Sequence, residues 1–172
     1  MANCGSVALS GIQRDCGANL GGVKKVWLIP NGKLTVTATN GVVTSMSLAS
    51  GSTWSKYEFK PGTAYMTSNL TKDASNGSLF WSTEVFMQFA RMEAAKRAEI
   101  NALASAEAQG VVLDANGTYW FVGKDEPVEA TAGVGQTGTA KTDGNFYSIT
   151  LTDNSLESPM PLSGSFISTM FV

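Results

Sequence analysis

This chain of 172 residues contains no histidine and two cysteines, Cys4 and Cys16. Histidine is the commonest general base and metal ligand in proteins, and a Ser-His-Asp triad is impossible without it. Two thiolates alone do not complete a zinc site. We therefore expect a protein that is not an enzyme and holds no cofactor or metal. We predict that the cysteines are free thiols, and a disulfide between them is the alternative.

Charge is also scarce, at 15% of residues against about 25% in an average globular protein. The net charge is −2 and no basic patch is present, which argues against tight binding of nucleic acid. No stretch reaches the ~18 apolar residues of a membrane helix, and the first residues do not resemble a signal peptide. Ser, Thr, Asn and 18 glycines replace the missing charge. This composition fits either a surface covered by neighbouring subunits or an ordinary all-β protein.

Short alternating segments bounded by turn residues predict a mainly β fold, a β-sandwich or barrel of antiparallel strands. Residues 23–29, 33–39 and 42–48 are separated by Asn-Gly pairs, a strong hairpin signal, and are predicted to form a three-stranded meander. Further strands are predicted over residues 54–60, 111–114, 118–122, 127–132, 146–152 and, as a terminal apolar strand, 165–172.

The longest predicted element is a hairpin with arms over residues 63–71 and 79–89. In the second arm, side-chain alternation places two sets of residues on opposite faces. Trp81, Val85 and Met87 are predicted to be buried beneath the subunit's own core. Ser82, Glu84 and Gln88 are predicted to face the other way.

The hairpin leads into one predicted flanking helix, over residues 90–109, which is rich in alanine. Its narrow apolar stripe predicts that it covers one sheet. Lys96 interrupts the stripe, so we expect its ammonium to reach water. Glu93 and Arg97 have the spacing of a favourable ion pair, and Gly110 is expected to end the helix.

Three motifs have a chemical and a structural interpretation. Residues 133–138 match G-x-G-x-x-G, but a strand-like segment follows where a dinucleotide site needs a helix, so a hairpin turn is favoured. Loop carboxylates are predicted to be solvated turn formers rather than an acid–base pair; they are Asp114, Asp125, Glu126, Asp143, Asp153 and Glu157. The four tryptophans are predicted to pack in the core, with a binding platform as the alternative; they are Trp27, Trp54, Trp81 and Trp120.

The glycine turn GQTGTAKTDGN, the strand FYSITLT and the acidic proline loop after it resemble bacteriophage tail tube (major tail) proteins. The specific likeness covers about a third of the chain, and the first half agrees in architecture alone. The resemblance implies a single β domain over residues 1–172, with an N-terminal arm over residues 1–22 and the terminal strand over residues 165–172. It also implies a β-sandwich with a flanking helix, in which four strands per subunit line a channel.

The family forms homo-oligomeric, usually hexameric, rings that self-assemble into a tube, the conduit for DNA ejection. The resemblance therefore implies a structural virion protein of the viral tail, assembled in the host cytoplasm. Its partners would be other tail and head–tail proteins, with transient passage of DNA and no membrane. We predict that Glu58, Ser82, Glu84 and Gln88 line the channel, where acidic and neutral groups let DNA pass without binding.

Two other classes of protein share this composition. A head–tail adaptor, connector or capsid decoration protein would form isolated rings or spikes and no filaments. A monomeric carbohydrate-binding β-sandwich would remain a single species in solution, and sugar would quench its tryptophan fluorescence.

Overall fold

A computed structural model describes residues 9–171. Eleven strands and two helices are found in this part of the chain. In chain order they are β1 Val23–Pro30, β2 Leu34–Thr39, β3 Val42–Leu48, β4 Ser55–Glu58, β5 Ala64–Asp73, β6 Ser78–Ala90, α1 Ala94–Ala104, β7 Glu107–Asp114, β8 Tyr119–Val122, β9 Val128–Gln136, β10 Phe146–Ser155, β11 Met160–Pro161 and α2 Ile167–Met170.

Four long strands form one antiparallel layer in the order β9-β10-β6-β5, which we call the long sheet. Its centre is β6, a strand of 13 residues. One row of paired residues crosses three of its strands, from Ala64 through Met87 to Ile149. The long hairpin of β5 (10 residues) and β6 (13 residues) thus confirms the predicted hairpin, whose predicted arms are slightly too short.

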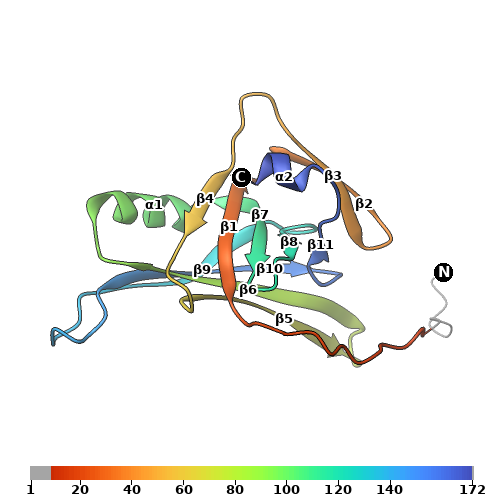
Figure 1. The fold of residues 1–172 in the computed structure, drawn as a ribbon, viewed down its shortest axis with the longest axis horizontal. Helices are drawn as coiled ribbons and strands as arrows, with labels where there is room; N and C mark the ends of the chain where they lie inside the picture. Colours follow the sequence, from red (N-terminus) through yellow and green to blue (C-terminus); the bar gives the residue numbers. More distant parts are fainter. Residues whose placement is uncertain (1–8, 172) are drawn as a thin grey trace.

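A second layer, the short sheet, has the order β4-β1-β7-β8-β11. It joins the long sheet through two residue pairs of β7 and β9, Glu107 with Glu129 and Ala108 with Val128. The chain bends at this junction, so that the short sheet stands over the long one (Figure 1). The predicted fold class, a mainly β sandwich with a flanking helix, is confirmed.

The main core lies between the two sheets and is closed at one end by α1. Along each strand every second residue points into it, because side chains alternate across a sheet. Its most buried members are Val26, Val85, Met87, Val112, Val128, Ile149 and Leu151. Leu103 and Ile100 are the residues by which α1 packs against this core.

A second core lies on the far side of the short sheet, under the β2–β3 hairpin and α2. Phe171 is 5% exposed here and packs its ring against those of Trp27 and Trp54. The terminal strand predicted over residues 165–172 is therefore wrong for the described residues, since Ile167–Met170 is helical. A short apolar run fits either structure, and here one helical turn brings Phe171 into the core.

The predicted meander is wrong in its pairing. The β2–β3 hairpin forms as expected, with positive φ angles of 52° at Asn40 and 75° at Gly41. However, β1 pairs with β4 and β7, and β2 with β3 alone. The reason is burial. The run from Val26 to Ile29 is buried on both faces, so its backbone has no water to bond and needs a paired strand at each edge, whereas β2 is largely exposed.

The predicted helix is too long. It spans Ala94–Ala104, and the segment predicted as its last turn opens strand β7. Gly110 is not its end but lies inside β7, where its Cα faces Leu28 and the Trp27 carbonyl of β1. Alanine-rich sequence favours helix locally, yet pairing with β1 buries more apolar surface and prevails.

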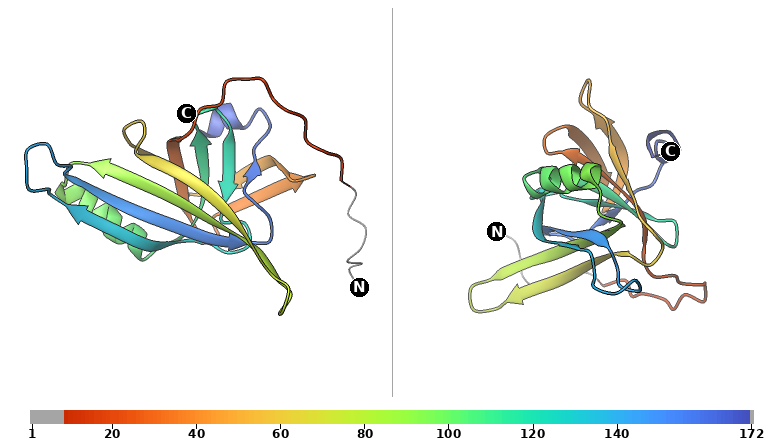
Figure 2. Two further views of the ribbon diagram at one scale, coloured as in Figure 1. Left: turned by 90° about the horizontal axis from the view of Figure 1, so that it is seen from below. Right: turned by 90° about the vertical axis from the view of Figure 1, so that its left-hand side faces the viewer.

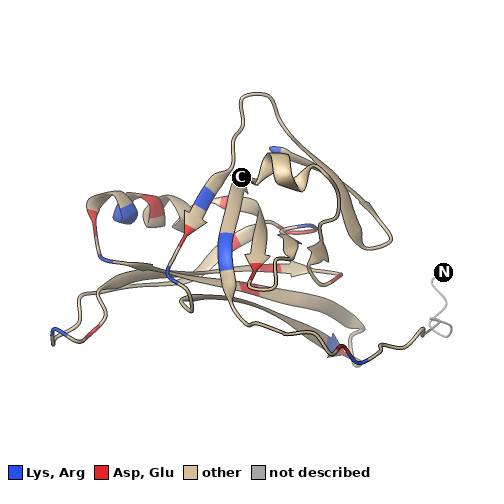
Figure 3. Ribbon diagram, viewed as in Figure 1, with Lys and Arg blue, Asp and Glu red and all other residues tan. Residues whose placement is uncertain are grey.

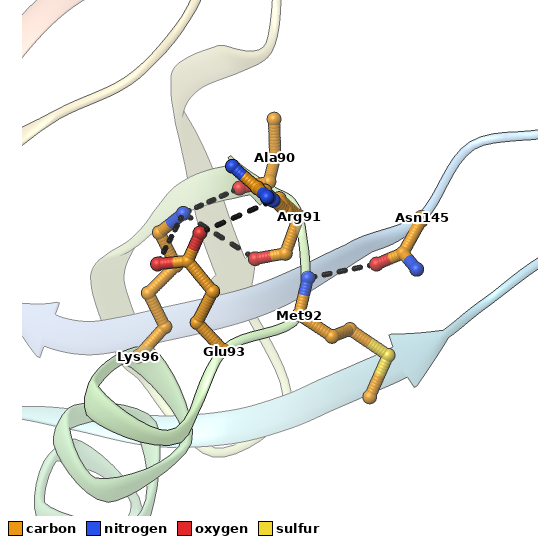
Figure 4. Close-up of polar contacts among 6 residues, drawn as sticks. All are labelled: Ala90, Arg91, Met92, Glu93, Lys96 and Asn145. Carbon is orange, nitrogen blue, oxygen red and sulfur yellow. Dashed lines mark hydrogen bonds and ion pairs between the residues drawn. The ribbon is translucent and has the colours of Figure 1, made fainter.

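The corner between β6 and α1 is held by polar contacts that differ from those expected (Figure 4). Lys96 Nζ donates to the carbonyl oxygens of Ala90 at 2.6 Å and Arg91 at 3.3 Å. Glu93 pairs with Arg91 at 3.4 Å and Lys96 at 3.7 Å, so the predicted pair with Arg97 is not formed. A backbone turn at Arg91, with φ of 69°, brings these groups together.

Candidate functional site: the bare face of the long sheet

The face of the long sheet that points away from the core carries no covering layer within residues 9–171, and we call it the bare face. Figure 2, left, looks onto it. Strand register places one row of four residues across it, namely Thr67, Glu84, Thr152 and Glu129. The neighbouring rows contain Tyr65, Phe86, Thr150 and Ala132 on one side, and Asn69, Ser82 and Asn154 on the other.

Glu84 lies in the middle strand of this face and is half-buried. Its Oε1 accepts a hydrogen bond of 2.8 Å from the hydroxyl of Tyr65, and this bond raises the pKa of Tyr65. The Tyr65 ring stacks on Phe86 with centroids 5.0 Å apart. The carboxylate is thus held in place at the surface of the sheet rather than buried.

The bare face has acidic groups and no basic ones. Asp73, Glu84 and Glu129 alternate onto it, whereas the one lysine in these four strands, Lys72, pairs with Leu79 on the opposite face at the hairpin tip. Lysine and arginine occur instead on β1, β4 and α1 and in loops (Figure 3). A surface with this charge repels phosphate and offers no cationic side chain to bind it.

The structure brings together three of the four predicted channel-lining residues. Ser82, Glu84 and Gln88 share the bare face, as alternation predicts. Glu58 does not join them, because β4 pairs with β1 at the edge of the short sheet. There its Oε1 lies 3.2 Å from Lys25 Nζ and 3.5 Å from Lys56 Nζ, and the hydrogen bond from Lys25 lowers the pKa of Glu58.

The opposite face of β6 also differs in part from the prediction. Val85 and Met87 are buried as expected, at 1% and 0% exposure, whereas Trp81 is partly exposed. Trp81 is paired with Leu70 near the hairpin tip, where the main core ends. The other three tryptophans pack in or against the cores as predicted.

Sequence reasoning missed Tyr65, Thr152 and Glu129 as members of the bare face. Their alternation was visible, since Thr150 and Thr152 interleave with the apolar Ile149 and Leu151. What was absent was the strand order, because β10 pairs with β6, and β9 with β10, across the intervening α1, β7 and β8. The motif at residues 133–138 proves to be the end of β9 and the start of a loop, and no helix opens on it.

The bare face is backed by one buried acid, Asp153, which is 4% exposed. It was predicted to lie in a loop, but β10 extends to Ser155 and turns it inward. Its Oδ2 accepts hydrogen bonds from Gly123 N at 2.9 Å and Ser155 Oγ at 3.1 Å, and burial raises its pKa. Asp143, by contrast, is an exposed turn former as predicted, and the backbone N–H groups of Ala140 and Thr139 lower its pKa.

These opposite shifts predict opposite effects of pH on stability. Because the pKa of Asp153 is raised in the folded protein, ionisation of Asp153 favours unfolding. This destabilisation is absent below about pH 4 and reaches its full size above the folded pKa. We expect the free energy of unfolding of the natural protein, minus that of Asp153→Asn, to fall as pH rises from about 4. For Asp143, whose pKa is lowered, the free energy of unfolding of the natural protein minus that of Asp143→Asn should instead rise with pH. Urea denaturation over a pH series measures both, and equal slopes would contradict the assignment.

Among residues 9–171 no group of three His, Cys, Asp or Glu side chains is placed to hold a metal ion. None of the helices in this range is long and apolar enough to cross a membrane. Cys16 is exposed. Cys4 lies outside the described residues, so the state of the two thiols stays a prediction.

The fold and the bare face together define a class: a two-sheet β-sandwich with a flanking helix, whose long sheet presents an uncovered, acidic and neutral surface. Comparison of the chain with protein-family models, with curated proteins and with solved structures gives no match. The geometry of this face and of its edges is therefore the main indication of function.

Proposed function

We propose that this protein is a structural subunit of a bacteriophage tail tube, assembling into stacked, hexameric rings that conduct DNA. The observation that carries the proposal is the bare face, which spans four long strands without a single lysine or arginine. Rings would turn this face toward the channel, so that DNA phosphates meet acidic and neutral groups. Other tail and head–tail proteins would be its partners in the virion.

Both edges of the long sheet are available for assembly. β5 pairs with β6 alone, and β9 beyond Glu129 has no strand on its outer side among the described residues. Because the four strands alternate in direction, β5 and β9 run opposite ways. A second copy therefore adds its β9 to β5 with antiparallel pairing, and the repeat continues head to tail until a ring closes.

Electron microscopy of the purified protein tests the proposal, with one pair of edge variants. The backbone N–H of Gln88 donates to the backbone carbonyl of Thr63 at 3.1 Å. Because backbone groups alternate in direction along a strand, the Ser68 N–H points away from β6, toward the free edge. Ser68→Pro removes that donor, and Ser68→Ala removes the hydroxyl alone, which contacts Thr83 at 3.0 Å.

The natural protein and Ser68→Ala should form tubes of uniform width. Ser68→Pro should fold, by circular dichroism, but stay dispersed. Isolated rings would favour the adaptor or decoration class. A monomer under all conditions would contradict assembly, and tubes from Ser68→Pro would contradict the role of the β5 edge.

A further inference from the structure

The described part of the N-terminal arm, residues 9–22, is tied to the domain at its inner end. Asn116, in the turn between β7 and β8, accepts a hydrogen bond from Leu20 N at 2.8 Å and donates one to Asn19 Oδ1 at 2.9 Å. Ala115 N adds a bond of 2.9 Å to the Gly22 carbonyl. Beyond these three hydrogen bonds, which we call the clip, the arm has no helix or strand and its residues are exposed.

Two apolar side chains of the arm are not covered by any other part of the chain that the structure describes. Leu9 and Ile12 are fully or almost fully exposed. An extended chain between Leu9 and Leu20 reaches on the order of 35 Å. Exposed aliphatic residues on a segment of this length indicate that the arm lies against a partner.

A groove of matching character lies between β4 and α1. It holds a cavity of about 320 Å³ with apolar walls from Tyr57, Phe89 and Ile100. Lys56 and Glu99 stand at its rim, and the Tyr57 hydroxyl donates to Glu99 Oε1 at 2.5 Å, which ties the two walls together. On this side β4 has no strand partner among the described residues, so its edge is open to an added strand.

The arm and the groove lie on opposite sides of the same strand. β1 pairs with β4 on one side and with β7 on the other, and the clip at Asn116 follows β7. The arm therefore leaves the domain on the side away from its own groove (Figure 1). A surface and its complement on opposite sides of one subunit generate head-to-tail contacts.

We propose that the groove between β4 and α1 receives the arm of a second copy of this chain, with Ile12 seated against Tyr57, Phe89 and Ile100. The inference rests on the head-to-tail assembly proposed above and names the contact that secures it. It adds an extended segment along β4, distinct from the pairing of β5 with β9.

Disulfide trapping between two differently marked copies tests the contact. With Cys4 and Cys16 replaced by serine, Ile12→Cys is mixed with Lys56→Cys, whose position lies on the groove rim, and the mixture is oxidised. We expect a covalent dimer from the mixture and none from either variant alone. Thr35→Cys is the control partner and should give no dimer, because Thr35 is exposed on β2, in the separate β2–β3 hairpin over the second core.

A matched pair of arm variants gives a second readout that needs no cysteine. Ile12→Asp should lose assembly in sedimentation and microscopy while melting like the natural protein, whereas Gln13→Asp should assemble. If the natural protein forms tubes but no mixed disulfide appears and Ile12→Asp assembles like Gln13→Asp, the arm contact is wrong and the tube proposal stands. If an Ile12→Cys/Lys56→Cys chain instead closes on itself, the groove holds its own arm. A natural protein that stays monomeric, with no mixed disulfide, overturns both proposals.

Discussion

Replacing Gly110 with alanine is expected to destabilise the protein by about 2–3 kcal/mol, because the new methyl group has no space. A Cβ at this position would lie 2.6 Å from Leu28 Cδ2 and 2.9 Å from the Trp27 carbonyl oxygen. Leu28 could shift, but the Trp27 oxygen belongs to the backbone of β1, which is held between β4 and β7. The midpoint of thermal unfolding should fall by roughly 5–10 °C for a chain of this size.

Chemical denaturation measures this loss, and a glycine in another strand serves as the control. Gly133→Ala in β9 would place its Cβ 3.4 Å from the Ser148 carbonyl, close to an ordinary contact. It should change the free energy of unfolding by less than about 1 kcal/mol. Combining Gly110→Ala with Leu28→Ala should cost less than the sum of the two, since one change makes room for the other. Full additivity would argue against the close packing of β7 on β1.

From the tail tube function proposed above, we expect that reversing the charge at Glu84 slows DNA ejection strongly while leaving assembly intact. Each subunit with Glu84→Lys changes by two charges at the middle of the bare face, in the row that holds Thr67, Thr152 and Glu129. Around a ring these lysines would form a belt able to bind phosphates. The variant should fold, because Glu84 is only half-buried and loses one hydrogen bond to Tyr65.

The experiment compares ejection rates of phage that carry each variant over a range of salt concentrations. Glu84→Gln should eject like the natural protein, because it adds no positive charge. Glu58→Lys is the matched charge reversal away from the bare face, beside Lys25 and Lys56, and should eject normally. The delay with Glu84→Lys should shrink at high salt, because salt weakens phosphate contacts. Equal rates for Glu84→Lys and Glu58→Lys would contradict a channel lined by the bare face.

Local pattern alone predicted most of the strands. The Asn-Gly turn at Asn40 and Gly41 and the alternation on either side of it located β2 and β3 to within one residue. The long hairpin was predicted for the same reason, and with it the separation of Ser82, Glu84 and Gln88 from Val85 and Met87. These features depend on neighbours within a few residues, which is the range over which alternation and turn chemistry act.

The errors share one physical cause, competition from residues far away in the chain. The helix ends at Ala104 because β1 needs β7 as a partner, and residues 165–171 are not a strand because Phe171 fits against Trp27 and Trp54. Glu58 leaves the candidate site for the same reason, since β4 pairs with β1. Local propensity is worth tenths of a kcal/mol per residue, and burying one large apolar side chain is worth about 2 kcal/mol.

The β-rich class, the long hairpin and the residues of β6 that share a face all follow from the amino-acid sequence. So does the scarcity of positive charge, on which the proposed function depends. By contrast, the pairing of β9, β10, β6 and β5 into one sheet emerges in the folded chain, and this pairing brings Tyr65, Glu84, Thr152 and Glu129 onto one surface. A strand's alternation shows which residues share a face, whereas its neighbours are chosen by burial across the whole chain.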